Sequence, residues 1–236
     1  RRQTYTCKKL SRPHRSIKTM NKEKTFTTYF FDFDGTICNT SEGIFASMEK
    51  VCEHYGLSYG KETFVKMIGP SLKESFSTIF NLPESEIQNA IDVYRAFYSK
   101  EGMYMCSVYD GVAETIAELK NRGKKIFVAT SKPEVYTKQI IEQKKLSDLF
   151  DFIGGADIAE RTRTEKIDVI NYIFAENNIT DKSGILMVGD RKYDILGAKK
   201  AGLKSCGILW GFGSQKEFTE AGADYIIEKP GELLSL

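Results

Sequence analysis

Short runs of apolar residues alternate with amphipathic stretches along most of the chain, and two of these runs end abruptly in aspartate. The first leads into Asp-x-Asp-Gly-Thr at 32–36, and the second leads into Gly-Asp-x-x-x-Asp at 189–194. Each run has the length and the β-prone composition of a buried strand. In an open parallel sheet, ligands bind beyond the carboxyl ends of the strands. Both strings are therefore expected to deliver their aspartates to one crevice.

In the second half of the chain, helix and strand patterns alternate. This alternation with short connections predicts an α/β fold, a doubly wound, Rossmann-like parallel sheet with right-handed crossovers. Helices are expected at 112–122, 133–145, 164–177, 193–201 and 214–221, and strands at 125–130, 152–154, 185–188, 204–209 and 225–227.

Residues 38–105 interrupt this alternation directly after the first strand, because their apolar positions follow helical spacing only. The interruption predicts an inserted four-helix cap over the carboxyl end of that strand. The α/β core would then consist of residues 25–37 and 106–236. The cap helices are expected at 41–55, 61–68, 71–80 and 84–101.

The composition adds limits to this picture. The chain has 236 residues, 41% of them hydrophobic, which is enough for a sizeable core. No apolar run approaches the roughly 18 residues of a membrane span, so no membrane partner is expected. The five cysteines form no C-x-x-C pair, which favours reduced thiols and a cytoplasmic protein.

The charge is unevenly distributed. Residues 1–24 carry nine basic side chains against Glu23 alone, and they show no apolar periodicity, so they are interpreted as a disordered basic arm. The arm is either a transit peptide or an extension that precedes a native start at Met20, and we favour the extension. The remaining chain is acidic and has no basic patch interleaved with aromatics, so no nucleic-acid partner is expected. A monomer or a homodimer is compatible with the sequence.

Candidate chemistry centres on Asp32, Asp34, Asp190 and Asp194. Either string alone fits an ordinary acidic turn. Four carboxylates in one crevice, however, need a counter-charge, and oxygen ligands of this kind suit Mg²⁺. A further strand ends in hydroxyls directly before a helix, where phosphate binds backbone N–H groups and the helix dipole. Those hydroxyls belong to Thr130 and Ser131, and Lys166 starts another expected helix.

Taken in order, these motifs resemble the haloacid dehalogenase superfamily. Over residues 26–230 the chain is similar to its phosphatase branch with a helical cap, in particular to a phosphoglycolate-phosphatase-like group that includes 5′-nucleotidases. The resemblance implies a Mg²⁺-dependent phosphatase for a small phosphomonoester, phosphoglycolate or a nucleoside 5′-monophosphate. It also implies an aspartyl-phosphate intermediate.

The resemblance further implies a role for each motif residue. Asp32 would be the nucleophile and Asp34 the acid and base. Asp32, Asp190 and the backbone carbonyl of Asp34 would bind Mg²⁺, with Asp194 acting from behind them. Thr130, Ser131 and Lys166 would bind the phosphoryl group.

Four rival functions stay open on the same fold. A dehalogenase is disfavoured by Asp34, because a halide leaving group needs no acid. A β-phosphoglucomutase-like phosphomutase or a pyrophosphatase would use the same motifs. A non-catalytic interaction protein would not need every charged motif residue. Within the cap, the candidates for substrate specificity are Lys73, Lys66 and Arg95.

Overall fold

A six-stranded parallel sheet forms the centre of the computed structural model, which describes residues 26–159 and 161–236. The expected basic arm at 1–24 lies outside the described residues. The strand order is β5-β4-β1-β6-β7-β8. The strands are β1 (Thr28–Phe31), β4 (Lys125–Pro133), β5 (Phe152–Ala156), β6 (Ile185–Gly189), β7 (Lys204–Ile208) and β8 (Tyr225–Ile227).

Strand β1 lies in the middle of the sheet, paired on one side with β4 and on the other with β6. Phe31, its last residue, is in register with Val128 of β4 and Val188 of β6. Because parallel strands in this register end at the same edge, the acidic string after β1 and the one after β6 start side by side.

Helices cover both faces of the sheet, and alternate residues of β1 point to opposite faces. Phe30 packs in one buried cluster with the apolar faces of α7 (Lys166–Glu176) and α8 (Lys192–Ala201). Phe31 belongs to a second cluster, with α5 (Val112–Asn121) and α6 (Glu134–Gln143). These layers confirm the predicted doubly wound α/β fold, in which α9 (Gln215–Ala221) precedes β8.

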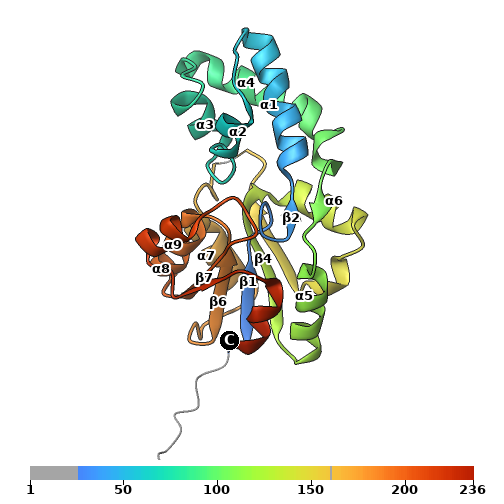
Figure 1. Ribbon diagram of the computed structural model, residues 1–236, viewed down its shortest axis with the longest axis vertical. Coiled ribbons are helices and arrows are strands. Elements are labelled where there is room, and N and C mark those ends of the chain that lie inside the picture. Colours follow the sequence, from blue (N-terminus) through green and yellow to red (C-terminus); the bar gives the residue numbers. More distant parts are fainter. Residues whose placement is uncertain (1–25, 160) are drawn as a thin grey trace, which may run out of the picture.

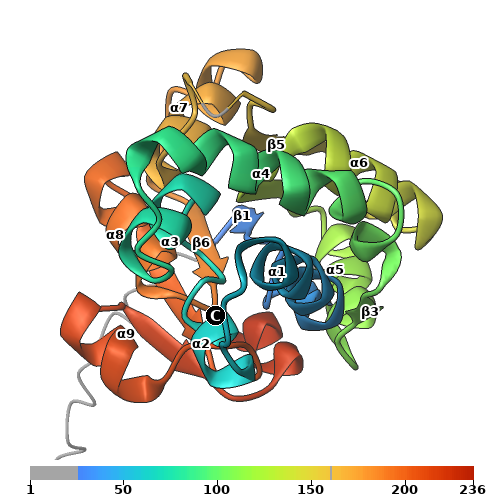
Figure 2. The same cartoon turned by 90° about the horizontal axis from the view of Figure 1, so that it is seen from above.

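Four helices between β1 and α5 stand above the carboxyl edge of the sheet (Figure 1). Seen from above, α1, α3 and α4 surround the end of β1 (Figure 2). Their buried faces join the same apolar cluster as the α5 side of the sheet, so this cluster runs continuously from core to cap. The helices are α1 (Ser41–Tyr55), α2 (Lys61–Val65), α3 (Leu72–Thr78) and α4 (Glu84–Tyr98).

Several boundaries differ from the expected ones. Helices α2 and α4 are each three residues shorter at the carboxyl end than the periodicity predicts. Strand β4 runs past Thr130 to Pro133 through a register shift against β5. A small antiparallel ribbon of β2 (Cys38–Asn39) and β3 (Ser107–Val108) joins the two ends of the cap segment, and its two-residue strands are too short to give a periodic signal.

Short 3-10 turns complete the described chain, η1 (Gly102–Tyr104), η2 (Ser147–Leu149) and η3 (Pro230–Ser235). Among the described helices, we find none with both the length and the apolar character needed to cross a bilayer.

Candidate active site

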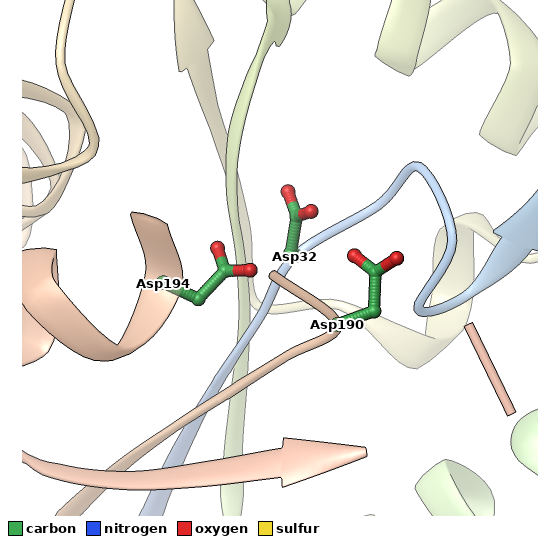
Figure 3. A group of neighbouring side chains, drawn as sticks. All are labelled: Asp32, Asp190 and Asp194. Atoms are coloured by element: carbon green, nitrogen blue, oxygen red, sulfur yellow. The ribbon is translucent and has the colours of Figure 1, made fainter. Parts of the chain in front are cut away.

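Three buried aspartates meet at the carboxyl edge of the sheet. Asp32 follows β1, Asp190 follows β6, and Asp194 lies in the first turn of α8. One carboxylate oxygen from each lies within 4.8 Å of the other two. Figure 3 shows the three side chains pointing toward a common point from their separate elements. The sheet register thus brings together two strings that are more than 150 residues apart in the chain.

Gly35 makes the approach of Asp190 possible. Its φ of +83° is the left-handed conformation that favours glycine, and a Cβ there would lie 2.1 Å from Asp190 Oδ2. The carboxylate of Asp190 accepts hydrogen bonds from the Phe212 backbone N–H at 2.9 Å and from Thr36 Oγ1 at 3.5 Å. Neutral donors therefore hold this carboxylate in place.

Lys166 supplies a buried positive charge to the other two aspartates. It is the first residue of α7, and its ammonium lies 2.8 Å from Asp32 Oδ1 and 2.8 Å from Asp194 Oδ1. It also donates a 2.7 Å hydrogen bond to the backbone carbonyl of Ala129 in β4. A buried ammonium is tolerated only when it is paired and hydrogen-bonded in this way. Lys166 therefore fixes the relative position of the nucleophile candidate and α8.

Burial and mutual repulsion control the ionisation of this cluster. Burial raises the pKa of Asp32 to about 6, Lys166 opposes that shift, and Asp194 adds to it. Burial also raises the pKa of Asp190 well above its ordinary value, and the charges of Asp32 and Asp194 reinforce the effect. Burial would lower the pKa of Lys166, but Asp194 and Asp32 more than reverse this and raise it. Such opposed shifts are typical of functional sites.

Asp34 has a cation of its own. The ammonium of Lys132 lies 2.9 Å from Asp34 Oδ1 and 3.0 Å from its Oδ2. The Lys132 side chain is only 5% exposed, compared with 18% for Asp34. The second acid of the first string is thus held apart from the three-aspartate cluster and faces a different partner.

The charges of these side chains fit a divalent cation. Four carboxylates stand against two ammonium groups, so the site carries an excess of two negative charges when all six are ionised. Asp190 is the carboxylate held by neutral donors, next to Asp32, and all the acidic donors are oxygen atoms. A hard dication such as Mg²⁺ would match both the charge and the ligand type.

A cavity opens between this cluster and the cap. We call its polar side the floor, which is formed by Asp32, Asp34, Asp194, Lys132 and Lys166. The Asp190 carboxylate lies close to those of Asp32 and Asp194, outside the lining. We call its cap side the roof, and that side is mainly apolar and aromatic. The roof consists of Ile44, Met48, Met67, Ile68, Gly69, Pro70, Ser71, Leu72, Tyr94, Arg95 and Tyr98.

The expected phosphate-binding residues also line the cavity. Thr130 is buried in β4, directly before the register shift, and Ser131 follows it. Of the three specificity candidates in the cap, Arg95 lines the cavity. Lys66 and Lys73 are exposed and do not belong to the described lining, and the Lys73 ammonium pairs with Glu84 at 2.7 Å.

Of the basic residues of the site, Lys132 was not assigned a role from the sequence, and Arg191 was indicated only as a cation at the rim of the crevice. Lys132 could have been found, since it follows Thr130 by two residues and four acids require more than one counter-cation. Arg191 follows Asp190 directly and donates through its guanidinium to the backbone carbonyl of Ile68, which ties α8 to the loop before α3. No local pattern marks that contact, because it depends on how the cap docks.

Comparison with known proteins agrees with this architecture. The family model of haloacid dehalogenase-like hydrolases matches residues 29–208. A 5′-nucleotidase of Pseudomonas aeruginosa is 31% identical, over 81% of this chain and 86% of its own length. The pyrophosphatase PpaX of Bacillus mycoides is 30% identical, over 89% of this chain and 95% of its own.

Solved structures give the same result. The crystal structure of a predicted phosphatase from Clostridium acetobutylicum superposes with a TM-score of 0.85 at 37% identity, covering 90% of this chain and all of that one. A haloacid dehalogenase-like hydrolase from Streptococcus pneumoniae superposes with a TM-score of 0.82 at 28% identity, covering 89% of this chain and 97% of that one. Fold and site together define a hydrolase of phosphate compounds. The chain belongs to the haloacid dehalogenase-like hydrolases.

Proposed function

We propose that the protein is a Mg²⁺-dependent phosphatase that hydrolyses a small phosphomonoester through an aspartyl-phosphate on Asp32. The observation that carries this proposal is the placement of Asp32. Its buried carboxylate lies 2.8 Å from the Lys166 ammonium, beside Asp190, at the floor of a cavity that also contains the separately paired Asp34. A nucleophile, an acid–base group and a phosphate-binding cation are thereby collected at one point.

In the first step, a carboxylate oxygen of Asp32 attacks phosphorus while the bond from phosphorus to the leaving oxygen breaks. Asp34, in its acid form, gives its proton to that oxygen. In the second step, Asp34 takes a proton from water, and the water oxygen attacks phosphorus and releases Asp32. The separate pairing of Asp34 with Lys132 supports this division of labour, because it gives the two aspartates different surroundings.

Asp32, Asp190 and the backbone carbonyl of Asp34 would hold Mg²⁺, which supplies positive charge so that an anionic nucleophile and an anionic phosphate can approach each other. Asp194 accepts from the Arg191 backbone N–H at 3.1 Å and pairs with Lys166. It therefore positions Lys166 and the start of α8. Thr130, Ser131 and Lys166 would donate to the phosphoryl oxygens, whose charge spreads in the transition state.

The roof favours a leaving group with an apolar part. Apart from Ser71 and Arg95, the side chains of the roof are apolar or aromatic. Such a surface gains by burying apolar area, which a nucleoside offers and a glycolate or a phosphate does not. We therefore favour a nucleoside 5′-monophosphate over phosphoglycolate, in line with the relative named 5′-nucleotidase. The described cysteines are free thiols, which supports a cytoplasmic enzyme.

A substrate panel tests the proposal. Phosphate release would be measured from AMP, phosphoglycolate, p-nitrophenyl phosphate and pyrophosphate, with Mg²⁺ and with EDTA, for the wild type and Asp32→Asn. We expect Mg²⁺-dependent release, highest kcat/KM for AMP, and no turnover by the variant. Preference for pyrophosphate would assign the activity of the relatives named PpaX instead. No phosphate release from any of these compounds, together with isomerisation of a sugar phosphate in a separate assay, would indicate a mutase. Turnover by Asp32→Asn would contradict the proposed nucleophile.

A further inference from the structure

Lys132 stands at the junction of the acid–base carboxylate and the cap. Its ammonium contacts both oxygens of Asp34, and its side chain is 5% exposed. Burial of an ammonium is unfavourable unless a nearby charge compensates it. Exclusion of water from Lys132 strengthens its ion pair with Asp34. The strength of this pair therefore depends on the groups that cover the Lys132 ammonium.

The cover is an aromatic ring of the cap. The Lys132 ammonium lies 4.7 Å from the centroid of the Tyr98 ring, in the last turn of α4. The Tyr98 ring stacks on Tyr94 with centroids 5.3 Å apart and an interplanar angle of 16°, and it meets Tyr136 of α6 edge-on at 5.6 Å. The electron-rich face of an aromatic ring attracts a cation, and the attraction is stronger where water is excluded. The ammonium thus lies between a core carboxylate and a cap ring that is fixed in place.

The backbone of β4 aims Lys132 at this position. The register of β4 against β5 shifts between Thr130 and Pro133, and the Lys132 backbone N–H donates to Thr130 Oγ1 at 3.2 Å. A Cβ at Gly155 of β5 would lie 2.6 Å from the Lys132 carbonyl oxygen, so the neighbouring strand has room for this irregularity only at a glycine. The bulge places Lys132 on the cavity side, next to the phosphate-binding candidate Thr130.

We propose that Lys132 is a positioning residue that couples docking of the cap to proton transfer by Asp34. The inference rests on the proposed phosphatase mechanism. With the cap docked, Tyr98 excludes water from the ammonium, which then holds the Asp34 carboxyl group in one orientation toward the cavity. As the Asp34 proton moves to the leaving oxygen, the ammonium compensates the negative charge that Asp34 acquires. With Tyr98 removed, water would screen the pair and loosen it.

The leaving group provides a direct test. The alkoxide of an alkyl phosphate is a poor leaving group and needs the proton of Asp34, whereas p-nitrophenolate leaves without a proton. The parameter kcat/KM reports the steps up to departure of the leaving group. It would be measured for p-nitrophenyl phosphate and for whichever of AMP and phosphoglycolate the wild type hydrolyses faster.

For Lys132→Met we expect kcat/KM to fall on the order of 10²-fold for the alkyl phosphate and only a few-fold for the aryl phosphate. Lys132→Arg should restore part of the alkyl activity, because it keeps the charge. Lys124→Met is the matched control: Lys124 sits at the opposite end of β4, where its ammonium donates to the Phe26 carbonyl. Lys124→Met should leave kcat/KM unchanged for both substrates. Thermal melting of each variant reports whether it is folded.

The cap side is tested by a double-mutant cycle. Tyr98→Phe keeps the ring and loses a buried hydroxyl that has no hydrogen-bond partner among the described residues, so the ratio of alkyl to aryl kcat/KM should stay close to that of the wild type. Tyr98→Leu should lower alkyl kcat/KM, and combining it with Lys132→Met should add no further loss.

Equal losses on both substrates for Lys132→Met, or additive losses in the cycle, would overturn the coupling while leaving the phosphatase proposal intact. If the wild type released phosphate from none of these esters, the proposed function would fail and the inference with it.

Discussion

The floor and the roof of the cavity are built on opposite principles. Floor side chains are charged, come from the ends of strands and the first turns of helices, and are held by ion pairs and hydrogen bonds such as those of Lys166. Roof side chains are mainly apolar, come from the cap helices and the loop before α3, and are held by packing against one another. This difference suggests that catalysis and substrate selection depend on separate sets of side chains. In the proposed mechanism, the floor carries out phosphoryl transfer and the roof selects the molecule from which the phosphate is taken.

Lys166→Met should have the largest effect, because it removes the cation shared by Asp32 and Asp194. We expect kcat to fall by roughly 10²–10³-fold, as for the loss of one preorganised transition-state donor. Breaking a buried pair should also cost about 3–5 kcal/mol of unfolding free energy. The matched control is Lys200→Met, whose exposed ammonium pairs with Glu165 at 2.7 Å directly beside α7. Steady-state phosphate release and urea unfolding give both numbers, and equal behaviour of the two variants would contradict a special role of Lys166.

Asp190→Asn should act through the metal. Its carboxylate lies in the three-aspartate cluster and is oriented by the Phe212 N–H, which an amide oxygen can also accept. The side chain at position 190 should therefore keep its orientation, while the negative charge of the metal ligand is lost. We expect the Mg²⁺ concentration for half-maximal activity to rise on the order of 10–100-fold.

The same shift should appear without substrate, as a smaller rise in Tm on addition of Mg²⁺ to Asp190→Asn than to the wild type. An unchanged Mg²⁺ titration would exclude Asp190 as a ligand.

A roof substitution should change KM and spare kcat. Leu72, at the start of α3, lines the cavity, whereas its neighbour Lys73 is exposed and paired with Glu84. Leu72→Ala should raise KM for AMP by roughly 10-fold, because a smaller apolar contact weakens binding of the leaving group. Lys73→Ala should leave KM unchanged. A rise in KM with Lys73→Ala and none with Leu72→Ala would move the specificity site to the outer surface of the cap.

The smallest effect is expected outside both regions, in the loop that leads to Lys166. Partial burial alone would raise the pKa of Asp157, but the backbone N–H groups of residues 161–163 lower it below its ordinary value. A carboxyl group whose pKa is lower in the folded state stabilises the fold at pH values above its unfolded-state pKa. This contribution to the free energy of unfolding is lost as the pH falls toward the folded-state pKa. Asp157→Asn should therefore cost about 1 kcal/mol at pH 7, or roughly 2–4 °C in Tm, and progressively less below pH 4. A pH-independent difference would contradict this origin.

Sequence reasoning predicted the floor far better than the roof, for a physical reason. Asp32 and Asp190 end apolar strands, so the strand pattern and the edge rule for parallel sheets were enough to bring them together. The contact between Arg191 and Ile68, by contrast, depends on the angle at which the cap sits on the core. That angle comes from packing of many apolar side chains, none of which has a local signature.

Lys132 falls between these cases. It lies inside a recognised string, yet its pairing with Asp34 depends on the bulge of β4 and on Tyr98 from the cap. The predicted helix ends at residues 68 and 101 were also wrong, since α2 ends at Val65 and α4 at Tyr98. The apolar spacing continues beyond these residues, but the chain there forms turns instead of a further helical turn.

Trapping of a phosphoenzyme tests the central role of Asp32 most directly. The protein would be mixed with ³²P-labelled substrate and Mg²⁺, quenched in acid, digested and analysed by mass spectrometry. Asp34→Asn would be run beside it with labelled p-nitrophenyl phosphate as the substrate for both proteins. This ester needs no acid for its leaving group, so loss of the base slows only hydrolysis of the intermediate. We expect hydroxylamine-labile phosphate on the peptide that contains Asp32, in larger amount for Asp34→Asn and absent from Asp32→Asn. Release of phosphate at the wild-type rate without label on that peptide in any variant would contradict nucleophilic catalysis by Asp32.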